Sequence, residues 1–130
     1  MNLGVAPGGN AHLTKDTAYE AMRAYVNSTE RFDAVFAASD VIAMSAIRAL
    51  TASGRSVPGD VAVVGFDDLA ISGYFNPPLS SVRQDLQRGA HIMVDLLFRR
   101  MSGENTPSAT MPAELVVRES SVAPAGRRRN

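Results

Sequence analysis

The sequence predicts an α/β fold in which helices cross over between the strands of a parallel sheet. Short apolar runs alternate along the chain with segments whose apolar residues recur at helical spacing. The run from Val61 to Phe66 is evenly apolar and rich in β-branched residues, as expected of a strand buried on both faces of a parallel sheet. Asp67 and Asp68 end this run at the edge where open α/β sheets bind their ligands. We therefore expect a small polar ligand at the carboxyl ends of the strands.

The first half of the chain is expected to form a β-α-β-α-β series. Its expected elements are a strand over residues 3–6, a helix capped by Thr14 or Asp16 that ends near residue 28, a short buried strand over 33–38, a helix and a strand from Val61. Either Ser39 or Asp40 can cap the second helix, because each offers an oxygen to free backbone N–H groups. Gly54 supplies the left-handed residue that ends this helix. Such a series makes parallel strands with right-handed crossovers.

The second half of the chain begins with a loop over residues 69–79, because the consecutive prolines in it exclude both a helix and a central strand. Residues 80–84 form a short extended piece. Asp85 then caps a third helix, whose apolar stripe continues until Gly103. A last strand is expected around residues 115–117.

Composition narrows the possible functions. The 130 residues can bury one core, and 13 basic residues balance 13 acidic ones, so this segment alone is a poor candidate for nucleic-acid binding. Cysteine is absent, which excludes disulfides and thiolate chemistry. His12 and His91 lie far apart without an acid at ligand spacing, so we expect no metal. No run is long enough to span a membrane, and the first residues lack the features of a signal peptide, so we expect a soluble chain without an export signal.

Five segments occur together in a recognisable order and spacing: residues 32–44, 54–58, 60–68, 77–85 and 115–121. Together they resemble the carboxyl-terminal half of the effector-binding (sensor) domain of LacI/GalR-family transcriptional regulators. In that family, two α/β subdomains of the periplasmic-binding-protein type clasp a sugar or a nucleobase. Their closure changes how a helix-turn-helix headpiece holds its operator. The resemblance implies that this chain lacks the headpiece, the hinge helix and most of the first subdomain.

The resemblance also implies a division of the chain. The fold is expected to be a periplasmic-binding-protein type I-like (Rossmann-like) subdomain with a parallel sheet, plus a crossover helix of the partner subdomain, and so an incomplete domain. The implied parts are the C-terminal sensor subdomain (1–85), the crossover helix and return segment (86–113) and the final strand (114–122). Residues 123–130, at the end of the chain, are expected to form a disordered tail. The apolar stripe of 86–113 would pack on the absent first subdomain.

The resemblance places four residues at the ligand. Asp67 matches the acid that hydrogen-bonds ligand hydroxyls or ring nitrogens, and a carboxylate that accepts from two neighbouring hydroxyls suits a sugar diol. Ser39 and Gln84 match polar positions that line the pocket. Leu13 stands where many members have an aromatic ring, so stacking is replaced by an aliphatic wall. Read without the family, Asp67 could equally cap a turn, and Ser39 and Gln84 could be plain surface residues.

Five more residues receive supporting or interface roles. Asp40 is expected to cap the second helix, and Asp68 to orient the loop backbone. Tyr74, Phe75 and the helix face around Arg48 match a region of the family that pairs subunits in a dimer. An aromatic pair on a proline-bounded loop also suits a protein interface on physical grounds. The alternative is that Tyr74 and Phe75 anchor the loop on their own subdomain.

The expected function is therefore the sugar-sensing part of a cytoplasmic, homodimeric transcriptional regulator, which needs no cofactor and reaches operator DNA only through a headpiece outside this chain. The alternative within the same fold is a fragment of a periplasmic sugar-binding protein of an ABC transporter. An enzyme would need Asp67 and Asp68 as a magnesium-binding or phospho-accepting pair with a third acid and a lysine. Lys15, the only lysine, follows no strand, so we expect no catalysis.

Overall fold

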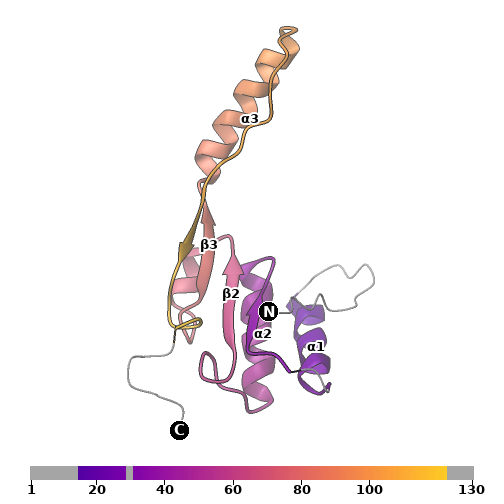
Figure 1. Cartoon of the computed structure of the whole chain (residues 1–130), viewed down its shortest axis with the longest axis vertical. Helices are drawn as coiled ribbons and strands as arrows, with labels where there is room; N and C mark the ends of the chain where they lie inside the picture. Colours follow the sequence, from indigo (N-terminus) through magenta and orange to yellow (C-terminus); the bar gives the residue numbers. More distant parts are fainter. Residues whose placement is uncertain (1–14, 29–30, 123–130) are drawn as a thin grey trace.

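The computed structural model describes residues 15–28 and 31–122. Its elements are α1 (Lys15–Val26), β1 (Ala34–Phe36), α2 (Asp40–Ala52), β2 (Ala62–Phe66), the 3-10 helix η1 (Ala70–Gly73), β3 (Ser80–Gln84), α3 (Leu86–Met101) and β4 (Ala113–Val116) (Figure 1). The predicted order of helices and strands is confirmed within this range. The segment over 69–79, predicted as a loop, contains η1. The strand expected over 3–6 and the tail 123–130 lie outside the described residues.

The sheet has four strands in the order β1-β2-β3-β4. β1 and β2 are parallel, as predicted, and β3, for which the sequence predicted only a short extended piece, is parallel to β2. β4 pairs antiparallel with β3, a direction that the sequence did not predict. The reason is the path of the chain: after α3 leaves the sheet, the return segment runs back along the helix and enters β4 from the far end (Figure 1).

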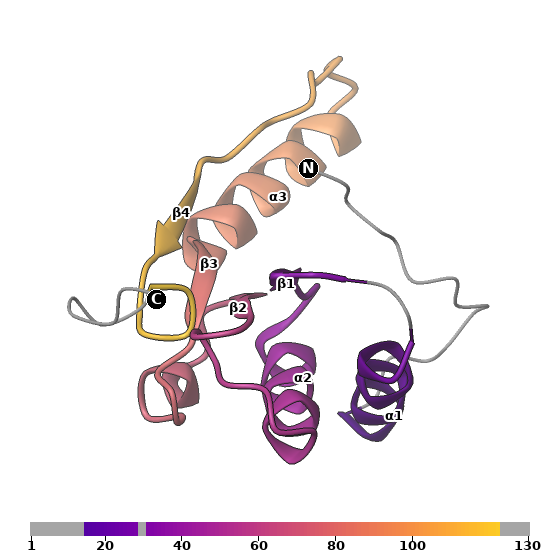
Figure 2. The same ribbon diagram turned by 60° about the horizontal axis from the view of Figure 1, so that its bottom comes forward.

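Only one face of β2 is fully buried by other parts of the fold. Val63 and Gly65 of β2 are buried, whereas Ala62, Val64 and Phe66 on the other face are half-buried. The prediction that β2 is buried on both faces is wrong in this respect. So is the prediction of a buried strand at β1, which carries an exposed Phe36 (61%). The cause is the arrangement of the helices, because α2 packs on the sheet and α1 packs beside α2 on the same side (Figure 2).

The core lies between α2 and the sheet. Its buried residues are Ala37, Ala43, Ile47, Leu50, Val61, Val63 and Leu79. The apolar stripe predicted for α2 therefore provides one wall of the core, and β2 provides the other.

The helix ends follow the sequence signals. Ser39 caps α2 by accepting a hydrogen bond from the N–H of Ile42 (3.4 Å), and Asp85 caps α3 in the same way from Arg88 (2.9 Å). Gly54 and Gly103 follow the C-caps of these two helices with φ of 79° and 85°. Both are left-handed conformations that glycine adopts without steric cost, so both predicted stops are confirmed.

α3 extends away from the rest of the fold (Figure 1), and none of its side chains is buried. The large apolar side chains that it leaves exposed are Leu86, Met93, Val94, Leu97, Phe98 and Met101. The sequence predicted that this stripe would find no partner within the chain, and the exposure confirms it. No helix in the described ranges is both long and apolar enough to span a bilayer.

Candidate functional site

Three of the four residues predicted at the ligand follow adjacent strands at one edge of the sheet. Ser39 follows β1, Asp67 follows β2 directly, and Gln84 is the last residue of β3. Because β2 lies between β1 and β3, Asp67 stands between the other two at the carboxyl edge. Leu13, the fourth residue, lies outside the described residues.

The backbone holds Asp67 in an unusual conformation. Its φ is 99°, in a region that residues with a side chain rarely adopt, while its N–H donates to the carbonyl of Val82 on β3 (3.0 Å). The residue is exposed, and its carboxylate makes no hydrogen bond or ion pair within 15–28 and 31–122. Residues in strained backbone cluster at binding sites, where the surrounding structure maintains them. Asp67 is thus an unsatisfied acceptor presented to solvent at the centre of the edge.

Asp68 is engaged by two arginines. Its side chain is only 5% exposed, with Arg83 Nε 2.6 Å from Oδ2 and Arg118 Nη1 2.7 Å from Oδ1. Burial by itself would raise the pKa of Asp68, but the hydrogen bonds and charges of Arg118 and Arg83 together hold it below its usual value of 3.8. This arrangement fits the predicted supporting role. Sequence reasoning did not single out the two arginines, although both lie in segments that carry the family resemblance.

Asp40 does not cap α2, and that prediction is wrong. Its carboxylate is completely buried, and it accepts hydrogen bonds from Leu69 N (2.7 Å), Ser72 Oγ (2.5 Å) and Ser81 Oγ (2.5 Å). The side chain points into the interior instead of back to the amides of its own helix, and neighbouring Ser39 takes the capping role. Ser72 and Ser81 were missed because only the tertiary fold brings them to Asp40.

Asp67 and Asp68, the two acids that the enzyme alternative would need as a pair, differ in their surroundings. Asp67 is exposed, whereas Asp68 makes ion pairs with Arg83 and Arg118. Among the residues that the structure describes, no three side chains of the metal-binding types lie together.

The predicted interface residues differ in their surroundings. Tyr74 is 88% exposed, while Phe75 is half-buried against the core and so serves as the loop anchor that the sequence left open. Arg48 is exposed, with its guanidinium carbon 5.7 Å from the centre of the Tyr19 ring. The face around η1 exposes further apolar side chains, Leu69 and Ile71.

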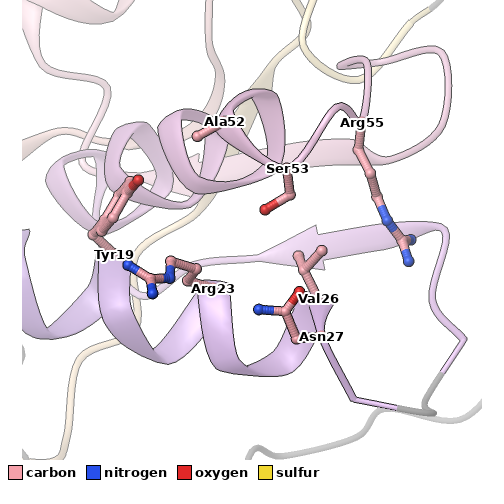
Figure 3. A pocket seen from close by; sticks show the side chains of 7 residues that line it. All are labelled: Tyr19, Arg23, Val26, Asn27, Ala52, Ser53 and Arg55. Atoms are coloured by element: carbon pink, nitrogen blue, oxygen red, sulfur yellow. The ribbon is translucent and has the colours of Figure 1, made fainter.

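A cavity of about 590 Å³ lies elsewhere, between α1 and α2 (Figure 3). It is lined by Tyr19, Arg23, Val26, Asn27, Ala52, Ser53 and Arg55. These residues lie toward the carboxyl end of α2, from which the chain enters β2 at its amino end. The cavity therefore lies toward the amino ends of the strands, whereas Asp67 lies at their carboxyl ends, and it does not contribute to the predicted site.

Comparison with known proteins shows the family to which this chain belongs. The family model for a periplasmic binding protein-like domain matches residues 5–121. The HTH-type transcriptional regulator CelR of Thermobifida fusca is 44% identical over 110 residues, covering 83% of this chain and 32% of CelR. The lactose operon repressor of Rhizobium radiobacter is 34% identical over 110 residues, covering 84% of this chain and 97% of that sequence.

Solved structures of transcriptional regulators are also similar to this chain. A structure titled as a complex of the transcriptional regulator CelR with cellobiose has a TM-score of 0.75 and 42% identity, covering 84% of this chain and 34% of that one. The chain spans about a third of the length of CelR, of the regulator MalR of Clostridium butyricum and of the repressor PurR of Photobacterium profundum. It belongs to the periplasmic binding protein-like family and, within it, to the sensor domains of LacI-family transcriptional regulators.

Proposed function

We propose that this chain is the part of a LacI-family transcriptional regulator that binds a sugar effector at the carboxyl edge of its sheet. The observation that carries the proposal is the Asp67 carboxylate, exposed and unpaired among the described residues at the centre of that edge. A carboxylate without a partner in the protein can exchange its bound water for the hydroxyls of a ligand, without the loss of a hydrogen bond inside the fold.

The chemistry of the edge suits a polyhydroxylated ligand. Asp67 can accept from two neighbouring hydroxyls of a sugar, which gives short charge-assisted hydrogen bonds. The Oγ of Ser39 already accepts from Ile42, so it remains able to donate its own proton. The half-buried amide of Gln84 can both donate and accept. Leu13 would cover the apolar face of the sugar ring.

The remaining parts of the proposal concern the intact regulator. Residues 86–113 would pack their exposed stripe on a first subdomain, and the face of Tyr74 and Arg48 would pair two subunits. Operator DNA would be reached through a headpiece outside this chain, in agreement with its net charge of zero. The regulator would act in the cytoplasm without catalysis or a cofactor. The periplasmic transport alternative is not favoured, because the reported relatives are transcriptional regulators.

Calorimetric titration of the intact protein in which this sequence occurs tests the proposal, with cellobiose and lactose as the probes. Asp67→Asn should weaken binding by about ten- to a hundredfold, because it weakens hydrogen bonds to a charged acceptor. Asp33→Asn is the matched control, since this exposed residue precedes β1 at the opposite edge of the sheet. It should bind as the unmodified protein does. Equal affinity of the Asp67 variant would refute the assigned contact, and an unmodified protein that binds neither disaccharide would refute this choice of sugars.

A further inference from the structure

The carboxylate of Asp40 is a buried charge held entirely by neutral donors among the described residues. It is the first residue of α2, where the helix dipole favours a negative charge. One oxygen accepts from Leu69 N and Ser72 Oγ, and the other accepts from Ser81 Oγ. Such an arrangement is costly to disturb, because a buried charge that loses a hydrogen bond also lacks water to replace it.

The space for this carboxylate is created by Gly65 of β2. A Cβ added to Gly65 would lie 2.3 Å from Oδ1 of Asp40, closer than any real contact. The glycine just before the carboxyl end of the strand is thus required by a side chain from another element. The segment between Val61 and Asp68 therefore contains both the exposed Asp67 and the glycine that leaves space for the buried Asp40.

Ser81 connects Asp40 to the end of β2. Its Oγ donates to Asp40 and accepts from the N–H of Asp68 (3.0 Å), so one hydroxyl joins the buried carboxylate to the backbone beside Asp67. On the other side, Leu69 and Ser72 belong to the segment that leads into and through η1. Asp40 therefore accepts directly from Leu69 and Ser72 of the η1 face, and Ser81 links it to the corner formed by Asp67 and Asp68.

We infer that Asp40 is a positioning residue that couples the conformation of the Asp67–Asp68 corner to the η1 face, which carries the exposed Ile71 and Tyr74. The corner requires an external constraint, because both of its residues have positive φ (99° and 49°). A change in the corner shifts Ser81, and the two oxygens of one rigid carboxylate transmit that shift to Leu69 and Ser72. In the proposed function, a sugar that binds at Asp67 would change the conformation of the η1 face by this route. Only this effect of the sugar rests on the proposed function.

Amide hydrogen exchange in the intact protein without ligand tests the coupling itself. Ser72→Ala removes a fully buried hydroxyl that bonds Asp40 and has no bond to Asp68. It should nevertheless raise the exchange rate of the Asp68 amide about tenfold relative to a core amide such as that of Leu50. By reciprocity, Ser81→Ala should raise the exchange rate of the Leu69 amide.

Ser120→Ala is the matched control. Ser120 is also fully buried, and its hydroxyl donates to Val63 O and accepts from Ser80 N, whereas the hydrogen bonds of Asp40 go to Leu69, Ser72 and Ser81. It should lower overall stability while leaving the ratio of Asp68 to Leu50 exchange unchanged. A loss of stability alone would not produce this difference between the two variants.

A second titration with cellobiose then tests the link to the ligand. Ser72→Ala should weaken binding several-fold, and Ser120→Ala should leave it unchanged. If Ser72→Ala and Ser120→Ala give the same exchange ratio for Asp68, the coupling is overturned, whatever the sugar affinity. If the unmodified protein does not bind cellobiose or lactose, only the proposed choice of sugars fails, because the exchange measurement uses no ligand and decides the coupling alone.

Discussion

Gly65→Ala should be among the most destabilising small substitutions in this chain. The added Cβ would lie 2.3 Å from Oδ1 of Asp40 and 3.2 Å from both Asp40 Cα and Leu79 Cδ2, whereas ordinary contact begins at 3.4 Å. The carboxylate must therefore move by more than 1 Å, away from its bond to Ser81. Overpacking costs about 1–3 kcal/mol, and a lost hydrogen bond to a charge costs about 1.5–3 kcal/mol. We expect a loss of about 4 kcal/mol in the free energy of unfolding.

Urea unfolding followed by circular dichroism measures this loss. Gly73→Ala is the control, because its Cβ would meet only Arg118 Nε at 3.9 Å and should change stability by less than about 0.5 kcal/mol. A double-mutant cycle with Asp40→Ala tests the reasoning, since truncating Asp40 removes the oxygen that the new Cβ would meet. If Gly65→Ala costs as much without the Asp40 carboxylate as with it, the clash is not the cause and the reasoning is refuted.

Two further predictions concern the charged cluster and the helices. The lowered pKa of Asp68 means that its carboxylate stabilises the fold fully above the unfolded value near 3.8, and that this contribution disappears as the pH falls through the lower folded value. In urea unfolding, Asp68→Asn should therefore lower the free energy of unfolding at about pH 7 and lower it much less at about pH 2. An equal loss at both pH values would contradict the stabilising role of the Asp68 carboxylate. Leu50→Ala, at a completely buried position, should cost about 3 kcal/mol, while Leu97→Ala, 58% exposed on α3, should cost less than about 1 kcal/mol. Similar losses for the two would show that α3 is covered in solution.

Local signals in the sequence predicted most of the elements. Capping by Asp85 and the stops at Gly54 and Gly103 depend on neighbours within one helical turn, so they can be read without the fold. The same holds for the apolar run that became β2. The choice between Ser39 and Asp40 as the cap of α2 could not be made in this way. The direction of β4 could not be read in this way, because a strand's partner and orientation depend on where the chain returns.

The sequence by itself determined the succession of helices and strands from β1 to β2, the position of Asp67 directly after β2 and the family of the domain, because apolar runs, the residues that end them and short motifs are local features of the chain. Only the tertiary structure decided what Asp40 and Asp68 do. Their partners, Ser72 and Ser81 for the one and Arg83 and Arg118 for the other, are 15 to 50 residues away along the chain. The sequence alone does not distinguish an aspartate that caps a helix from one that faces solvent or is buried. The hydrogen-bond donors that the fold brings to its carboxylate decide among these three roles.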